Sequence, residues 1–131
     1  KLTEHDYRIS IKLSAFRITV TRGPAVVVDA PVGLGLAQTQ TPVGRYYTKE
    51  LLQPPRPDGV YGPYAYGLSG FSNQLSSFAG GEAVIGIHGT NDPSGLGKNV
   101  SAGCIRMPNA DIVRLVEDVK LPLGVPVDIA P

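Results

Sequence analysis

The sequence predicts a mainly β domain with one α-helix packed against it. Apolar and polar residues alternate at period two along the first third of the chain, which is typical of half-buried strands. The 16 glycines and 12 prolines among 131 residues interrupt these runs without a fixed period, as in a loop-rich β fold. Helical periodicity is confined to one segment, 110–120.

The strands are expected in two groups. Runs 9–13, 16–20 and 25–29 are separated by tight turns, and short runs joined in this way form an antiparallel meander. The remaining strands are expected at 45–52, 64–70, 83–89 and 125–129.

The expected helix carries its own start and stop signals. Asn109 is placed to cap it, and Asp111 falls in the first turn, where the helix dipole favours an anion. Pro122 and Gly124 follow its end. One apolar stripe faces the core and consists of Ile112, Leu115, Val116 and Val119.

Two long connections are expected between these elements. Residues 33–44 are glycine-rich and are expected to be flexible. Residues 53–63 contain four prolines, so regular structure is excluded there. A long, stiff loop of this kind is either a lid or binding loop, or a surface excursion, and both interpretations stay open.

Length and charge limit the class of protein. A chain of 131 residues fits a single domain, 1–131. Only 18% of residues are charged and the net charge is +1, which argues against nucleic acid or an anionic membrane as partner. The chain starts at Lys1 without a spanning stretch or signal-peptide pattern. We therefore expect an excised domain or a processed product, with any targeting segment missing.

The sequence gives no sign of a cofactor or a metal ion. Gly33 and Gly35 begin a dinucleotide-like pattern, but Gln38 occupies the position of its third glycine and no helical periodicity follows. The histidines, Cys104 and the carboxylates show no metal-ligand spacing. We expect neither kind of group.

One histidine and one cysteine carry the main chemical signal. His88 ends an expected strand, and Cys104 starts the next one after a turn-rich loop that can fold back. The chain has a single cysteine, so an internal disulfide is impossible. Cys104 is therefore either a buried small hydrophobe or a nucleophile. The plain structural alternative is that both residues are inert parts of core strands.

A nucleophilic cysteine needs its neighbours. A free thiol has a pKa of about 8.5, and an adjacent imidazole can take its proton and hold the thiolate as an ion pair. Gly103 leaves backbone N–H groups free to bind an oxyanion. Arg106 lies two residues beyond Cys104, so in a strand it faces the same side. We expect Cys104 to be partly accessible to solvent.

These residues form a pattern that is similar to a known family. Residues 87–91 read Ile-His-Gly-Thr-Asn, and residues 101–107 read Ser-Ala-Gly-Cys-Ile-Arg-Met. With the helix that follows, they resemble the L,D-transpeptidase catalytic domain, or YkuD domain. Weaker similarities extend the resemblance over about 7–129 and lie at 41–46, 61–64, 67–69 and 124–127.

The resemblance implies a β-sandwich of mixed sheets with one packed helix. It implies a cysteine L,D-transpeptidase that attacks a peptidoglycan tetrapeptide stem after its third residue, releases D-Ala and passes the acyl group to an amine of another stem. Peptidoglycan stem peptides, as donor and acceptor, and carbapenem inhibitors are the implied partners. The implied location is the bacterial cell envelope outside the cytoplasm, with membrane attachment only through a segment not present here.

The resemblance also implies roles for individual residues. Cys104 matches the nucleophile, His88 the general base, and the Gly89 carbonyl the group that orients that base. Backbone N–H groups of Gly103 and Cys104 match the oxyanion hole. The remaining matches in the substrate-binding segment are Ser101, Ala102 and Arg106.

One departure and two alternative functions accompany this assignment. Many family members have a histidine where this chain has Ala102, which leaves His88 as the candidate base because His5 lies near the start of the chain. The alternatives are an L,D-carboxypeptidase, with water as acceptor, and a catalytically silent peptidoglycan-binding module.

Overall fold

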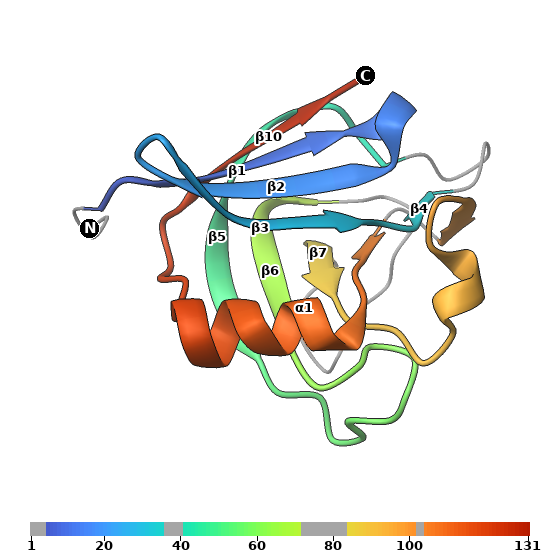
Figure 1. Ribbon diagram of the computed structural model, residues 1–131. Helices are drawn as coiled ribbons and strands as arrows, with labels where there is room; N and C mark the ends of the chain where they lie inside the picture. The colour runs from blue at the N-terminus through green and yellow to red at the C-terminus, as the bar shows by residue number, and fades with distance from the viewer. Residues whose placement is uncertain (1–4, 36–40, 72–83, 102–103) are drawn as a thin grey trace.

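The computed structural model describes residues 5–35, 41–71, 84–101 and 104–131. Its main element is a mixed eight-stranded sheet that curls around the core, with one helix packed beneath it (Figure 1). The prediction of a mainly β fold with mixed sheets and one packed helix is confirmed. A two-stranded sheet accompanies the large one.

The first three strands form the predicted antiparallel meander. They are β1 (Tyr7–Lys12), β2 (Arg17–Arg22) and β3 (Ala25–Pro31), with antiparallel pairing throughout. The 3₁₀ turn η1 (Leu13–Ala15) joins β1 to β2, and Gly23 turns the chain into β3 with a positive φ of 56°. Alternation puts Ile9 and Ile11 of β1 in the core, while their polar neighbours stay outside.

The last strand joins this meander to the rest of the large sheet. β10 (Pro126–Ala130) pairs parallel with β1 and antiparallel with β5 (Gly44–Leu52). Next in order come β6 (Ala65–Phe71), β7 (Val84–His88) and β9 (Ile105–Arg106). β6 pairs antiparallel with β5 and β7, whereas β7 and β9 run parallel.

The helix packs its apolar stripe on the sheet as predicted. It comprises α1 (Asn109–Val113) and a π-type continuation, η4 (Arg114–Val119). Ile112 and Leu115 are fully buried, and Val116 and Val119 pack against the same core. Lys120 ends the helix in the left-handed conformation with φ 58°.

The predicted capping role of Asn109 is wrong. The N-cap position is held by Pro108, and no side chain bonds to the helix start. Asn109 is the first helical residue, and its side-chain oxygen accepts a hydrogen bond from the Thr90 N–H at 2.8 Å. A tertiary contact has therefore taken the acceptor that a cap would have used.

The two long connections differ from each other. In the stretch expected to be flexible, Leu34–Gly35 forms strand β4, which pairs parallel with β8 (Asn99–Ser101). Gly33 and Arg106 exchange two backbone hydrogen bonds of 2.9 Å just before β4. The proline-rich residues 53–63 contain turns but neither helix nor strand, as predicted.

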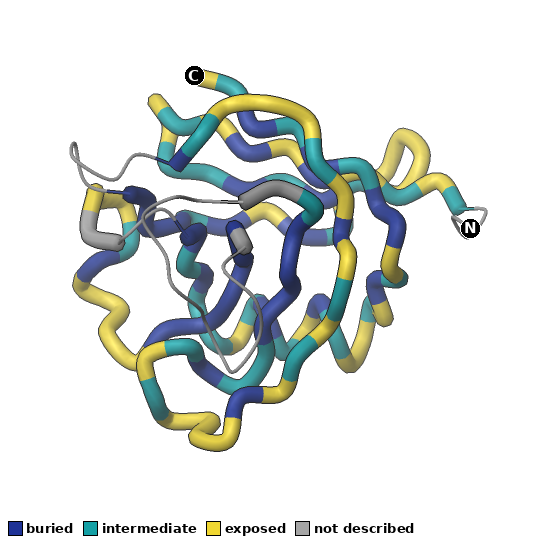
Figure 2. The backbone as a smooth tube through the Cα atoms, turned by 180° about the vertical axis from the view of Figure 1, so that it is seen from behind, coloured by how far each residue is buried: buried dark blue, intermediate teal, exposed yellow. Residues whose placement is uncertain are grey.

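The buried backbone lies mainly in the inner strands, and the exposed backbone lies in the turns and the helix's outer face (Figure 2). In the described part of the chain, no helix is both long and apolar enough to span a membrane. The fold thus brings His88, Cys104 and Arg106 to the edge of the sheet formed by β7 and β9.

Candidate active site

Strands β7 and β9 bring the histidine and the cysteine to the same edge of the sheet. The parallel register pairs Ile87 with Ile105 and His88 with Arg106. Both isoleucines belong to the hydrophobic core, so the alternate residues on each strand face the other way. His88 and Arg106 therefore share the face opposite the core, and Cys104 directly precedes β9. The Arg106 charge acts on both His88 and Cys104, so the three residues lie near one another.

His88 is held in one orientation by its own loop. Its side chain is 3% exposed, and its ring Nδ1 lies 2.5 Å from the Gly89 carbonyl oxygen. Because a carbonyl can only accept, Nδ1 carries the proton in this contact and Nε2 keeps its lone pair. The Tyr61 ring meets His88 edge to face, with centroids 5.0 Å apart.

The same surroundings keep His88 uncharged. The pKa of His88 is lowered to about 4, mainly by burial; the Gly89 hydrogen bond acts in the opposite direction, and the Arg106 charge adds a smaller lowering. At neutral pH the ring is a neutral imidazole, the form that can accept a proton.

Cys104 is more enclosed than the sequence suggested. The residue is 4% exposed, so the expectation of partial accessibility is wrong. Burial raises the pKa of the Cys104 thiol, although a hydrogen bond with the Gly86 backbone and the Arg106 charge both lower it. These shifts favour a neutral thiol beside a neutral imidazole at rest, and not the ion pair that the sequence suggested.

Arg106 supplies the positive charge of the site. Its Nε is buried and has no hydrogen-bond partner within the described ranges. Its charge lowers the pKa of Cys104, of His88 and of the nearby Asp92. A buried donor without a partner, close to the thiol, is suited to bind an anionic group.

Gly89 is required by the close approach of two loops. A Cβ at this position would overlap the Asn109 side-chain oxygen and would lie 3.1 Å from the Gly62 Cα. The Gly89 N–H donates to the Tyr64 carbonyl at 3.3 Å, which ties the His88 loop to the end of the proline-rich loop. Neither Asn109 nor Gly62 is among the residues predicted for the site from the sequence.

The structure describes only some of the other residues that the sequence brought into question. Ser101 ends β8, and Ala102 and Gly103 lie outside the described residues. His5 hydrogen-bonds with Tyr7 and with the Gly124 carbonyl, in a part of the fold distinct from β7 and β9. No group of three or more His, Cys, Asp and Glu side chains among the described residues could hold a metal ion.

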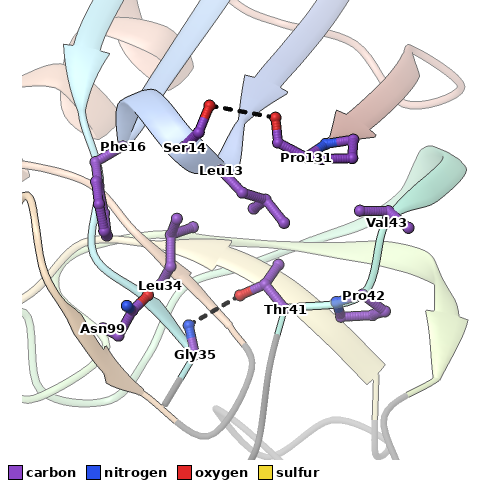
Figure 3. Close-up of a pocket in the computed structure, with 10 residues that line it drawn as sticks. All are labelled: Leu13, Ser14, Phe16, Leu34, Gly35, Thr41, Pro42, Val43, Asn99 and Pro131. Atoms are coloured by element: carbon purple, nitrogen blue, oxygen red, sulfur yellow. Dashed lines mark hydrogen bonds between the residues drawn. The ribbon is translucent and has the colours of Figure 1, made fainter. Parts of the chain in front are cut away.

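One cavity within the described residues lies apart from His88 and Cys104. It has a volume of about 820 Å³ and lies between η1, β4 and residues 41–43, where Thr41 accepts a hydrogen bond from the Gly35 N–H (Figure 3). Neither His88 nor Cys104 lines it. A smaller cavity of about 370 Å³ adjoins the His88 loop and is lined partly by Thr90 and Asn109.

Comparisons with known proteins agree with this geometry. The family model of the L,D-transpeptidase catalytic domain, YkuD, matches residues 6–129. The YkuD protein of Bacillus licheniformis, a candidate L,D-transpeptidase by name, is 36% identical over 125 residues, which are 95% of this chain and 66% of the relative. Its Bacillus subtilis counterpart is 35% identical over 113 residues, 86% of this chain and 60% of the relative.

Solved structures show the same fold. The L,D-transpeptidase LdtMt1, in complex with imipenem, superposes with a TM-score of 0.68 at 20% identity and covers 98% of this chain and 60% of its own. The chain thus spans about 60 to 66% of the length of these relatives. With a family model matched over nearly the whole chain, this protein belongs to the L,D-transpeptidase catalytic domain (YkuD) family.

Proposed function

We propose that this domain is a cysteine L,D-transpeptidase that cross-links peptidoglycan stem peptides through a thioacyl enzyme on Cys104. The observation that supports the proposal is the β7–β9 pair, which sets the strand ending at His88 alongside the strand that begins directly after Cys104. The contact of His88 Nδ1 with the Gly89 carbonyl leaves Nε2 to act as the base. Family membership supports the same activity. We place the reaction at the peptidoglycan outside the cytoplasm and treat 1–131 as the catalytic domain.

The proposed first half-reaction starts from two neutral groups. As Sγ of Cys104 attacks the carbonyl carbon of the stem's third residue, His88 Nε2 takes the thiol proton. Backbone N–H groups of Gly103 and Cys104 hold the oxyanion that forms. The C–N bond to D-Ala then breaks, His88 returns its proton to the leaving amine, and a thioester with Cys104 remains.

The second half-reaction runs through the same residues. The amine of another stem attacks the thioester carbonyl while His88 accepts its proton. The C–S bond breaks, and the proton returns to the Cys104 sulfur. Arg106 stabilises negative charge in both halves, since its charge favours the thiolate form of Cys104. A substrate carboxylate is a second proposed partner for its Nε, which has no hydrogen-bond partner among the described residues.

The test is incubation of the protein with a tetrapeptide stem and mass spectrometry of the products. A transpeptidase releases D-Ala and forms a dimer, whereas an L,D-carboxypeptidase releases D-Ala and leaves a tripeptide. Cys104→Ala should abolish both products, and His88→Ala should lower turnover about 10²- to 10⁴-fold. His5→Ala is the control and should leave turnover unchanged.

The burial of Cys104 is also what a silent binding module would show, so a second arm tests whether the thiol reacts. The relative LdtMt1 is known in complex with imipenem. We propose that this carbapenem acylates Cys104, adding one drug per chain in the intact-protein mass spectrum and none in Cys104→Ala. A folded, reduced protein that stays unmodified and releases no D-Ala would favour the silent module.

A further inference from the structure

We propose that Asn109 is a positioning residue for His88 and that it acts through the peptide unit between Gly89 and Thr90. The proposal depends on the proposed role of His88 as base. It concerns how the ring is held, which can be measured separately from turnover.

One peptide unit connects the two side chains. Its carbonyl, from Gly89, accepts the hydrogen bond of His88 Nδ1 at 2.5 Å, and its N–H, from Thr90, donates to Asn109 Oδ1 at 2.8 Å. In a trans peptide these two groups point in opposite directions within one plane. Any rotation of the unit that moves the N–H away from Asn109 therefore also moves the carbonyl away from His88.

The neighbouring peptide is fixed by other contacts. The His88 carbonyl accepts from the Met107 N–H at 2.7 Å, and the Gly89 N–H donates to the Tyr64 carbonyl at 3.3 Å. Among the contacts of the described residues, the Gly89–Thr90 unit is held at its N–H by Asn109. The amide side chain thus fixes the one peptide whose carbonyl touches the His88 ring.

The packing around Asn109 accommodates this contact. Gly62, with φ 66°, and Gly89 both lie against the Asn109 side-chain oxygen. A Cβ at Gly62 would lie 2.5 Å from that oxygen and 2.6 Å from the Gly89 Cα. Two positions without side chains therefore leave the space that the Asn109 oxygen occupies, although the helix start would ordinarily use such an oxygen as a cap.

An amide suits the position because it is neutral. The hydrogen bond to Thr90 polarises the peptide and strengthens its carbonyl as an acceptor for Nδ1–H. With the proton held on Nδ1, Nε2 is free to act as base. Without Asn109 the carbonyl can turn away, and the ring can carry its proton on Nε2, where it blocks the base. An aspartate would keep the acceptor but add a negative charge that raises the pKa of His88.

The test follows the His88 ring nitrogens by ¹⁵N NMR across a pH titration, together with kcat and KM. Asn109→Ala should shift the ring from the Nδ1–H tautomer toward a mixture and lower kcat about ten- to a hundred-fold, as loss of a histidine-orienting group does elsewhere. Asn109→Asp should restore the Nδ1–H tautomer and move the histidine titration to higher pH. Asp111→Asn, in the same helical turn, is the control and should change neither.

The outcomes separate this proposal from the proposed function. An unchanged tautomer and titration in folded Asn109→Ala would overturn the positioning role, whatever the activity. If Asn109→Ala does not fold, a loss of the Nδ1–H tautomer in Asn109→Asp would overturn it as well. A shifted tautomer in Asn109→Ala supports the positioning role of Asn109. Equal turnover of wild type and His88→Ala would overturn only the assignment of His88 as base, and not this role.

Discussion

At the residue scale, the site is governed by burial more than by pairing of charges. His88 and Cys104 are both enclosed, and burial is the largest effect on the pKa of each. It lowers the pKa of the imidazole and raises that of the thiol, so both shifts favour the uncharged pair. A negative charge then develops on the Cys104 sulfur only when the thiol proton moves to His88 Nε2. Arg106 is the nearby cation that can offset that negative charge.

The first prediction concerns this cation. Replacing Arg106 with Ala should raise the pKa of both Cys104 and His88, because the Arg106 charge lowers both. Arg106→Lys should keep the thiol near its original pKa but remain impaired in turnover, since an ammonium lacks the planar fork. The measurement is the ultraviolet absorbance of the thiolate against pH, with Cys104→Ala subtracted as blank. Identical titrations of the wild type and Arg106→Ala would contradict the assignment.

The charge state of this pair could not be predicted from the sequence. The motif from His88 to Arg106 indicated which residues meet, but an ion pair and partial exposure were expected. Whether a side chain is enclosed depends on segments far away in the chain, such as the loop that brings Tyr61 against His88. Local spacing contains no information on that enclosure.

At the scale of elements, periodicity identified the long strands and the helix, and tertiary contacts decided the rest. Strand β4 escaped prediction because two residues are too few to show a period. The helix start was misassigned because asparagine is a preferred cap, yet here the Thr90 N–H takes its oxygen. Both errors lie where segments distant in sequence meet.

The second prediction tests the approach of the proline-rich loop to the His88 loop. Gly62→Ala puts a Cβ 2.6 Å from the Gly89 Cα, so it should cost about 1 to 3 kcal/mol through overpacking, beyond the cost of its positive φ. Gly97→Ala is the matched control: its φ is +80° and no atom lies within 4 Å, so it should cost only the left-handed penalty of about 1 to 2 kcal/mol. Urea unfolding of both variants measures the difference.

The outcome of that comparison is specific to the contact. A Gly62→Ala variant no less stable than Gly97→Ala would show that the two loops separate at little cost. In that case Gly62 would not be needed to hold the Asn109 side chain against the His88 loop.

At the scale of the whole molecule, β10 makes one sheet of two parts. It lies between β1 of the meander and β5 of the half that carries His88 and Cys104. One hydrophobic cluster contains residues of both halves, from Ile9 in β1 to Ile105 in β9. Because the halves share a core, we expect them to unfold together, so that a shift at His88 contributes to the stability of the entire domain.

The last prediction follows from this coupling. The unfolded His88 imidazole binds a proton near pH 6.5, whereas the folded one does so only near pH 4. Between these values the unfolded state holds more protons, so the free energy of unfolding decreases as the pH falls. The full loss of unfolding free energy from the titration of His88 is on the order of 3 kcal/mol, and none of it occurs above about pH 6.5.

His88→Asn replaces the ring with a side chain that does not titrate. Urea unfolding at several pH values between about 7 and 4 should therefore show wild type losing more stability than the variant. Parallel curves for the two proteins would mean that His88 titrates alike in both states, and the lowered pKa of the buried His88 would have to be abandoned.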